Sequence, residues 1–400
     1  MNDTPKPKVV NDENLARLVR ELNADRGAAV RPVEEAALEG SAGTALRRLL
    51  FEADRRGATD VLLVPGAPPV VRVAGRLERL GEDMLADGDV DAMFRPLLTP
   101  DTRRTFEAGA PVDLALRIAG EGEPLRYRLN LHRQRGVVAA SLRRIHARIP
   151  TLAELNLPRE LADVIEPVRG LVLVCGPTGS GKSTTLAAMI GEINAKRSCH
   201  IVTIEDPIEY EHRHGRSIVE QVEVGRDVPD FATALRAALR QDPDVILVGE
   251  IRDADTAATA LAAAETGHLI LATLHTNDVV QSIHRLVDIF PPERHAQVRQ
   301  QLSFCLNAIV CQQLVAATDG KLVPVVELLL PNDAVRTHIR TGHLQNLYNE
   351  LTLGQRSGMV TFEKSLARLV ESGRLPLAEA RRRASRPEEL DSILRRPAQG

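Results

Sequence analysis

The sequence predicts an α/β protein, with a parallel sheet covered by helices on both faces and a smaller α+β domain before it. From Leu161 onward, short apolar runs alternate with helical segments, as expected where each parallel strand needs a crossover helix. One of these runs leads directly into a glycine-rich loop at residues 176–184. The chain has 400 residues, more than one typical domain, so two or three domains are expected.

Composition and proline content divide the chain into five predicted segments. Residues 1–40 are polar and charged, which predicts a flexible N-terminal extension. Residues 41–148 are expected to form the α+β domain, and the proline-containing residues 149–158 a linker. Residues 159–372 are expected to form the α/β domain with a helical C-terminal part. Residues 373–400 are predicted to be a helical tail that is partly flexible.

The N-terminal domain is predicted to combine helices with a mostly antiparallel sheet. A helix is expected over residues 44–56, where leucine and alanine recur at helical spacing. Two shorter helices are expected over residues 89–95 and 103–108, and a Pro-Asp pair marks the start of the second. Apolar runs, several of them bounded by glycine or proline, predict strands at 61–64, 70–73, 112–118, 125–132 and 137–145.

The α/β domain is predicted from its apolar runs and the helical segments between them. Strands are expected at 171–175, 200–204, 245–248 and 268–273. The intervening helices are expected at 183–193, 231–240 and 254–265. The C-terminal third is predicted to be mainly helical, with helices at 281–289, 293–315, 334–340 and 361–371.

The loop after the first of these strands has the spacing of a phosphate-binding loop. Gly176, Gly181, Lys182 and Ser183 occupy the fixed positions of G-x-x-x-x-G-K-[ST]. The glycines allow backbone N–H groups to turn towards phosphate oxygens, a path that a Cβ atom would prevent. Lys182 is expected to reach the β- and γ-phosphates of ATP, and the Ser183 hydroxyl to bind Mg²⁺. The predicted nucleotide site, which we call the phosphate loop, comprises Gly176, Pro177, Thr178, Gly179, Ser180, Gly181, Lys182, Ser183 and Thr184.

A glycine-rich turn that binds no ligand is the alternative interpretation of this loop. The strand, the loop and the following helix stand in the order that the motif requires, which argues against that alternative. The sequence therefore predicts a protein that binds a nucleoside triphosphate.

Carboxylates follow two other predicted strands. Glu250 ends the apolar run 245–249, and at the edge of a parallel sheet it would lie near Mg²⁺ and the γ-phosphate. Glu205, Asp206 and Glu209 stand within five residues, a crowding that a nearby cation would relieve. The alternatives are that Glu250 caps the next helix and that the acidic segment is a solvated turn.

Two histidines flank the predicted strand at residues 268–273. His268 opens this strand, and His275 follows its end together with Thr276 and Asn277. A histidine at such a position can hydrogen-bond a γ-phosphate or a catalytic carboxylate. A satisfied structural imidazole is the alternative, and the sequence leaves both interpretations open.

Arginines gather in the strands of the predicted N-terminal domain. They are Arg126, Arg128, Arg133, Arg135, Arg143 and Arg144. Such a cluster can be a solvated face. It can also supply arginine fingers, which stabilise the charge of phosphoryl transfer, to a nucleotide bound at a domain or subunit boundary.

Composition bounds the class of partner. The chain has 51 basic and 54 acidic side chains, so its formal net charge of −3 favours neither nucleic acid nor an anionic membrane. Aromatic residues make up 2% of the chain, which scarcely supplies the stacking platforms of a single-strand channel. No run of 18 apolar residues is present and the four cysteines form no C-x-x-C motif. We therefore expect a cytoplasmic protein with no direct membrane insertion and no nucleic-acid partner.

Four motifs occur in order along the α/β domain. They read Gly-Pro-Thr-Gly-Ser-Gly-Lys-Ser-Thr, Ile-Glu-Asp-Pro-Ile-Glu-Tyr, Asp-Pro-Asp-Val-Ile-Leu-Val-Gly-Glu-Ile-Arg-Asp and Gly-His-Leu-Ile-Leu-Ala-Thr-Leu-His-Thr-Asn. Together they closely resemble the secretion ATPases of type II secretion and type IV pili. In that family these stretches are the Walker A motif, the Asp box, the Walker B motif and the His box. The resemblance runs from about Leu46 to Val370.

Within this family the sequence most resembles the PilT-type pilus retraction ATPases. Arg72–Arg76 and Arg126–Asn130 resemble parts of their N-terminal domain. No four-cysteine zinc motif follows the His box, whereas assembly and secretion ATPases usually carry one. Ala334–Arg340 stands where the retraction branch has Ala-Ile-Arg-Asn-Leu-Ile-Arg-Glu, and it departs from that motif at Val335, Thr337, His338 and the following Thr341.

The resemblance implies a RecA-like P-loop ATPase domain, a PAS-like N-terminal domain and a ring-shaped homohexamer that hydrolyses ATP. It implies that Lys182 and the loop amides hold the phosphates. Ser183 and Glu250 would organise Mg²⁺, and Glu209 would act as the general base.

The resemblance also suggests further roles around the γ-phosphate. His275 or His268 would sense this phosphate. Arg128 and Arg143 would act as arginine fingers supplied by another domain or subunit.

The implied partner is the inner-membrane platform protein of a pilus or secretion machine, which would recruit the ATPase peripherally to the inner membrane. The PilT-type resemblance implies type IV pilus retraction, with pilus assembly or type II/IV secretion as alternatives within the family. A hexameric nucleic-acid translocase and a non-hydrolysing regulatory protein are alternatives from other classes. The low aromatic content argues against the first, and the presence of both Glu209 and Glu250 argues against the second.

Overall fold

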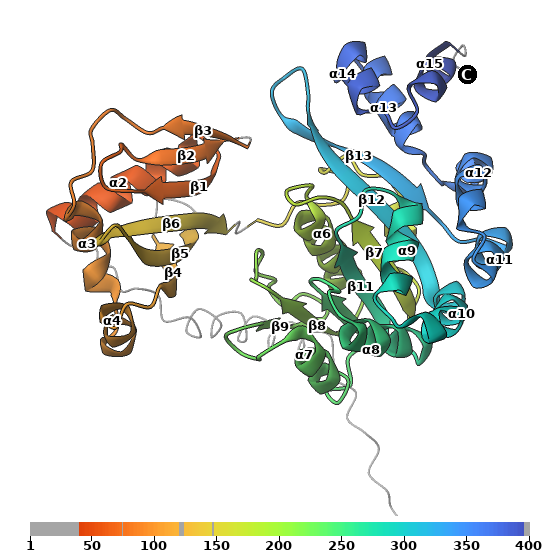
Figure 1. Cartoon of the computed structure of the whole chain (residues 1–400), viewed down its shortest axis with the longest axis horizontal. Helices are drawn as coiled ribbons and strands as arrows, with labels where there is room; N and C mark the ends of the chain where they lie inside the picture. Colours follow the sequence, from red (N-terminus) through yellow and green to blue (C-terminus); the bar gives the residue numbers. More distant parts are fainter. Residues whose placement is uncertain (1–39, 74, 120–123, 146–147, 396–400) are drawn as a thin grey trace, which may run out of the picture. The chain divides into compact units, whose positions relative to one another are not determined.

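The computed structural model describes residues 40–395, apart from residues 74, 120–123 and 146–147 (Figure 1). The chain divides into two compact units, residues 1–148 and residues 149–400. The extension predicted for residues 1–40 lies almost wholly outside the described residues, as do residues 396–400. The predicted α/β fold class is confirmed, with an antiparallel sheet in the first unit and a largely parallel sheet in the second.

The first unit is built on a six-stranded antiparallel sheet with the order β3-β2-β1-β6-β5-β4. Its strands are β1 (Ala58–Leu63), β2 (Val70–Val73), β3 (Arg76–Arg79), β4 (Val112–Ile118), β5 (Leu125–Gln134) and β6 (Val137–Ile145). Its helices are α2 (Ser41–Arg55), α3 (Asp89–Phe94) and α4 (Pro100–Glu107). Strand β3 is absent from the predicted strands, because this exposed edge strand carries no apolar alternation.

The second unit contains a seven-stranded sheet with the order β13-β12-β7-β11-β10-β8-β9. Only the β12–β13 pair is antiparallel among these neighbours. The strands are β7 (Gly170–Cys175), β8 (His200–Glu205), β9 (Ile218–Glu223), β10 (Val245–Val248), β11 (Leu269–Leu274), β12 (Leu306–Ala316) and β13 (Leu322–Leu329).

Helices follow the strands of this sheet and continue beyond it. Those up to the last parallel strand are α5 (Glu160–Val164), α6 (Lys182–Lys196), α7 (Phe231–Ala238), α8 (Ala254–Glu265), α9 (Val279–Asp288) and α10 (His295–Cys305). The C-terminal helices are α11 (Asp333–Thr341), α12 (Leu347–Leu353), α13 (Phe362–Glu371), α14 (Leu377–Arg383) and α15 (Pro387–Arg395).

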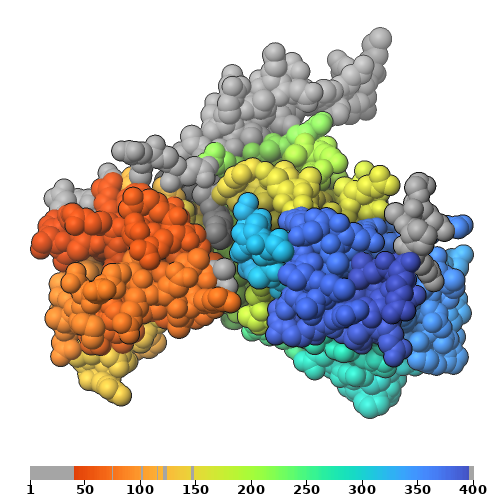
Figure 2. Space-filling view, turned by 90° about the horizontal axis from the view of Figure 1, so that it is seen from above, coloured from red at the N-terminus to blue at the C-terminus, as the bar shows by residue number. Residues whose placement is uncertain are grey.

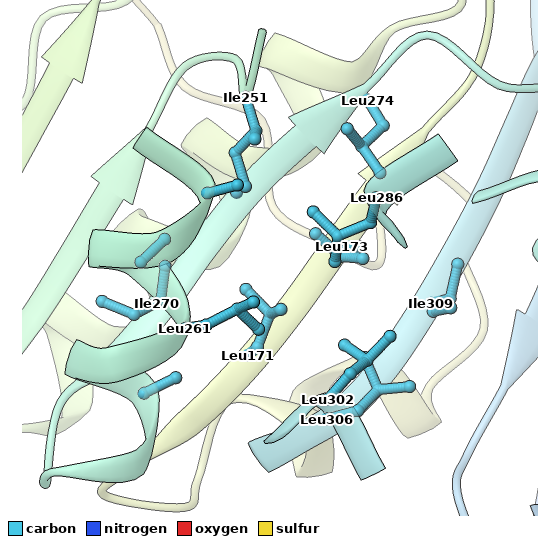
Figure 3. Packing of buried hydrophobic residues seen from close by; sticks show 14 of the residues in the cluster. Leu171, Leu173, Ile251, Leu261, Ile270, Leu274, Leu286, Leu302, Leu306 and Ile309 are labelled. Carbon is cyan, nitrogen blue, oxygen red and sulfur yellow. The ribbon is translucent and has the colours of Figure 1, made fainter. Parts of the chain in front are cut away.

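Both faces of the sheet are apolar, because the fully buried strand β7 contributes side chains to each. Leu171 and Leu173 join the cluster formed with α7, α8, α9 and α10, and Figure 3 shows them beside Ile270 of β11 and Leu261 of α8. The alternate residues of β7 join the cluster formed with α5 and α6 on the other face. This two-sided core holds the carboxyl ends of the strands in place.

The segment predicted as a linker packs on the second unit. Leu152 and Leu157 are buried in the same cluster as α6, and Thr151 and Glu154 exchange hydrogen bonds within the turn. Most of residues 149–158 therefore belongs to the second unit rather than to a free connection between units.

The predicted helix over residues 293–315 is wrong in its second half. Helix α10 ends at Cys305, and residues 306–316 form β12, which pairs in parallel with β7. The run is continuously apolar from Ala308 to Cys311, and periodicity cannot distinguish a buried strand from a buried helix there. Strand β13 was missed with it, since β12 is the partner against which it pairs.

The last two helices pack against α13 and the β12–β13 hairpin. Ala380 of α14 and Leu390 of α15 are fully buried in a cluster with Leu366 of α13. The buried carboxylate of Glu363 accepts a hydrogen bond from the backbone N–H of Arg386 at 2.9 Å, which holds the start of α15. Figure 2 shows these C-terminal helices, in blue, as one continuous surface of the second unit.

Among the described residues, no helix combines the length and the apolar character that crossing a membrane would need.

Candidate nucleotide-binding site

The phosphate loop lies at the carboxyl end of β7, where parallel α/β sheets bind their ligands. Strand β7 ends at Cys175 and helix α6 begins at Lys182. Gly176, Gly179 and Gly181 all have positive φ angles, of 147°, 77° and 87°, which favour glycine at each position. The loop thus leads into the N-terminus of α6, where free N–H groups and the helix dipole favour an anion.

Lys182 lies against the loop and is influenced electrostatically by two carboxylates. Its Nζ donates hydrogen bonds to the carbonyl oxygens of Gly176 at 2.9 Å and Pro177 at 3.1 Å. Burial lowers the pKa of Lys182, and electrostatic interactions with Glu250, Cys175 and Glu209 oppose this effect. The structure therefore brings both predicted carboxylates into the electrostatic neighbourhood of the loop lysine.

Glu250 follows β10, and its carboxylate contacts the side chains of Arg252 and His275. Its Oε2 accepts a hydrogen bond from Arg252 Nε at 2.7 Å, and its Oε1 lies 3.2 Å from His275 Nε2. Arg252 also lies 3.8 Å from Asp206, so it connects the Walker B and Asp-box segments. Arg252 is not among the predicted site residues, although it stands two residues after Glu250.

Backbone contacts between neighbouring strands set the position of Glu250. The N–H of Gly249 donates to the carbonyl of Ile204 at 2.8 Å, and the N–H of Ile251 donates to Thr273 at 3.2 Å. The Thr273 hydroxyl donates to the carbonyl of Gly249. Glu250 is thus anchored between β8 and β11.

The first carboxylate of the Asp box, Glu205, is partly buried and is hydrogen-bonded within the protein. Glu205 accepts hydrogen bonds from the Thr203 hydroxyl at 2.7 Å and from Gln221 Nε2 at 3.1 Å. Burial raises the pKa of Glu205 to about 7, against these hydrogen bonds and one from the backbone of Glu209. Its partners hold the Asp-box segment to β9.

A hydroxyl pair connects the Asp box to the phosphate loop. Tyr210 is buried, and its OH lies 2.8 Å from the hydroxyl of Thr184 in the first turn of α6. Gln221 Nε2 donates to the carbonyl of Tyr210 at 2.8 Å. The residue before Tyr210 is Glu209, so these contacts hold the segment that presents Glu209. Tyr210 ends the Asp-box motif, but the motif does not predict this contact, because the pairing is made across 26 positions of sequence.

The two predicted histidines lie at opposite ends of β11. His275 follows the carboxyl end and contacts Glu250. His268 precedes the amino end, and its Nδ1 lies 3.1 Å from the carbonyl of Ala263. Six residues of strand separate the two ends, or about 20 Å. His268 is therefore remote from the phosphate loop, and the prediction that it senses the γ-phosphate conflicts with its place in the sheet.

The two predicted arginine fingers are neighbours in the first unit. Arg128 of β5 and Arg143 of β6 are directly paired across the antiparallel ladder. Arg143 Nε donates to Asp60 at 3.0 Å, and Arg128 Nε lies 3.7 Å from Asp113. The Arg143 side chain is 61% exposed and the Arg128 side chain is 37% exposed. Both guanidinium groups therefore present charge at the surface of this unit.

Residues 139–354 match the family described as Type II/IV secretion system protein. The chain belongs to this family. It is 40% identical to the type IV pilus retraction ATPase PilT of Pseudomonas aeruginosa, over 86% of this chain and 99% of that protein. It is also 40% identical to the type IV pilus ATPase PilU of the same organism, over 88% of this chain and 90% of that protein.

A solved structure supports the same relationship. The pilus retraction motor PilT with bound ADP is 44% identical, has a TM-score of 0.78, and aligns with 86% of this chain and 98% of that one. The predicted resemblance to secretion ATPases of the PilT type is confirmed. As a member of this family the chain is an ATP hydrolase.

In this secretion-family ATPase the segment Ala334–Arg340 forms most of α11. Arg336 donates to the carbonyl of Ser303 at 2.7 Å and so satisfies a carbonyl in the last turn of α10. His338, which departs from the expected motif, lies 3.6 Å from Glu350 of α12. The segment therefore joins three helices of the C-terminal part.

We predict that Tyr210→Phe lowers the ATP turnover number about three- to tenfold, the range expected for one lost hydrogen bond. The substitution removes only the hydroxyl that ties the Glu209 segment to Thr184. Steady-state kinetics measure the effect. The matched control is Tyr127→Phe, which removes a buried hydroxyl bonded to Leu50 in the first unit and should leave turnover unchanged. An unchanged turnover number in Tyr210→Phe would refute this role.

We predict that Glu205→Gln stabilises the protein relative to wild type as pH rises from 5 to 8. The folded-state pKa is about 7 against an ordinary value of 4.5. Between these values the unfolded chain loses the proton that the folded chain keeps. Wild-type stability from this group therefore falls through that window and stays lowered above it. Urea unfolding at several pH values measures the difference, with Glu371→Gln at an exposed position as control. A pH-independent difference would contradict the prediction.

Proposed function

We propose that the chain is a hexameric motor that hydrolyses ATP to power type IV pilus retraction. The observation that carries this proposal is the meeting of the phosphate loop, Glu250 and His275 at one edge of the sheet. Similarity to PilT over nearly the whole length of that protein supports the pilus role.

In the proposed reaction, water attacks the γ-phosphate in line with the leaving ADP oxygen. Lys182 and the inward-facing loop amides hold the β- and γ-phosphates and balance their charge. Ser183 and Glu250 offer hydroxyl and carboxylate oxygens, the ligands that suit Mg²⁺ beside phosphate oxygens. When bound, Mg²⁺ supplies neutralisation of the charge that develops on the phosphoryl oxygens.

Glu209 is the proposed general base. Its charge interacts with that of Lys182. Its position depends on the hydrogen bond between the hydroxyls of Tyr210 and Thr184. Within the described part of the chain, its carboxylate accepts no side-chain hydrogen bond, whereas Glu250 is already bound by Arg252 and His275. An uncommitted carboxylate is the better acceptor for a proton from water.

His275 is the proposed γ-phosphate sensor. Because it contacts Glu250, a hydrogen bond from its ring to the phosphate would report phosphate presence directly to the metal-binding carboxylate. We do not extend this role to His268, which lies at the other end of β11.

Arg128 and Arg143 are the proposed trans-acting arginine fingers. They present exposed charge side by side from the first unit. In a ring of six subunits, that unit would complete the site of a neighbour, so a change in phosphate charge would alter the contact between subunits. The ring would be recruited to the inner membrane by a platform protein of the pilus machine.

Pilus assembly and type II or type IV secretion are the alternatives within the family. The comparable identity to PilU, whose name states no direction, keeps a different pilus role open to test. A hexameric nucleic-acid translocase is disfavoured by the few aromatic residues.

We predict that Glu250→Gln and Glu209→Gln each lower phosphate release at least about a hundredfold while nucleotide binding persists. Lys182→Ala should weaken nucleotide binding as well. Phosphate release and calorimetric ADP titration measure the two effects, with Glu293→Gln at an exposed position as control. Phosphate release that survives Glu250→Gln would sink the assigned role of Glu250, and a wild-type protein without ATP hydrolysis would refute the motor.

We predict that deleting the gene produces cells with excess surface pili that no longer retract. Electron microscopy counts the pili, and a gene carrying Lys182→Ala should fail to restore the normal number. Missing pili would instead identify an assembly motor, and normal pili with lost secretion would identify a secretion motor. Either of these two results would refute the proposed role in pilus retraction.

A further inference from the structure

Gln312 lies on β12 and contacts the phosphate loop. The sequence predicts a helix at this position. Its neighbour Cys311 pairs with Cys175, so Gln312 lies directly beside the first glycine of the loop. The backbone approach is close, since a Cβ atom on Gly176 would lie 2.3 Å from the carbonyl oxygen of Gln312. The loop glycines therefore accommodate β12 as well as a phosphate.

The side-chain amide of Gln312 makes a hydrogen bond at each end. Nε2 donates to the carbonyl of Ser180 at 2.7 Å, and Oε1 accepts from the hydroxyl of Thr185 at 2.8 Å. Gln312 is only 3% exposed, and Thr185 is fully buried, so water does not compete for these groups. One side chain thus holds both the loop and the first turn of α6.

The contact with Ser180 determines the direction of a loop amide. In a planar trans peptide the C=O and the following N–H point in opposite directions. Because the Ser180 carbonyl is drawn towards Gln312, the N–H of Gly181 is turned away from β12. A phosphate-binding loop uses its backbone N–H groups to cradle the α- and β-phosphates, so an N–H directed away from β12 can take this role.

We propose that Gln312 is a positioning residue for nucleotide binding, which orients the Ser180–Gly181 peptide towards the phosphates. The inference rests on the proposed function only in that the loop binds a nucleotide. ADP and ATP share the α- and β-phosphates, so the residue contributes equally to binding both. A contribution of that kind changes KM and ADP affinity and leaves kcat nearly unchanged.

The neighbouring glutamine provides a matched control. Gln313 has the same chemistry, but successive residues of a strand point to opposite faces, so it faces away from the loop contact. It is paired across the ladder with Val325 of β13 and is only partly buried. The same substitution at both positions therefore separates the loop contact from the general effect of changing a glutamine in β12.

Gln312→Met and Gln313→Met are compared with wild type by calorimetric ADP titration, steady-state ATPase kinetics and thermal unfolding. Gln312→Met should weaken ADP binding about tenfold, equal to about 1.4 kcal/mol. It should raise KM to a similar extent, with kcat within about twofold of wild type. Gln313→Met should leave all three quantities near the wild-type values.

Gln312→Glu keeps the shape of the side chain and serves as a second variant if Gln312→Met folds poorly. It retains an acceptor for Thr185 but places a carboxylate against the Ser180 carbonyl, so it should also weaken ADP binding about tenfold or more. Thr185→Val removes only the other contact and should keep ADP affinity within about threefold of wild type.

The inference is overturned if Gln312→Met or Gln312→Glu binds ADP like wild type, or if either lowers thermal stability while KM stays unchanged. These results differ from a failure of the proposed motor. A wild-type protein that binds ADP without hydrolysing ATP would refute the motor, and the ADP affinities of the same variants would still decide the role of Gln312.

Discussion

The register of the parallel strands around β7 is the constraint on which the rest of the structure depends. Leu274 of β11 pairs with Cys175, and Val248 of β10 pairs with both Ala272 and Ile204. The strands therefore end together, and the phosphate loop, the Asp box, the Walker B carboxylate and the His box emerge at one edge. A slip of one residue would turn each strand's side chains to the opposite face, so they would no longer fit the helices packed there. It would also shift the segments that follow the strands relative to one another.

Buried polar side chains then hold these emerging segments in one arrangement. Gln312 binds the loop, Tyr210 connects the Asp box to Thr184, and Glu205 fastens that box to β9. A buried polar group without a hydrogen-bond partner destabilises the folded state. Each of these contacts therefore favours the observed arrangement of the site over arrangements in which the contact is broken. The segments that carry Glu209 and Lys182 are consequently placed by groups that take no direct part in the reaction.

Sequence reasoning predicted the groups at this edge better than the residues that support them. The phosphate loop and Glu250 could be found because each depends on a local backbone path or a strand end. Gln312 could not, because a continuous apolar run left the helix and strand interpretations of residues 306–316 equally consistent. His268 and His275 each adjoin an end of the same strand, so the sequence does not show which of them lies near the phosphate loop. The length of β11 separates them in the structure.

The sequence by itself determined the alternation of strands and helices, the phosphate loop and the membership of the secretion ATPase family. These properties are written in nearby residues, through periodicity and through motifs with fixed spacing. Only the tertiary structure decided the strand order, the pairing of β12 with β7, and the contacts of Gln312 and Tyr210. Such contacts join residues far apart in the chain, so they depend on which strands become neighbours, and no local pattern specifies that choice.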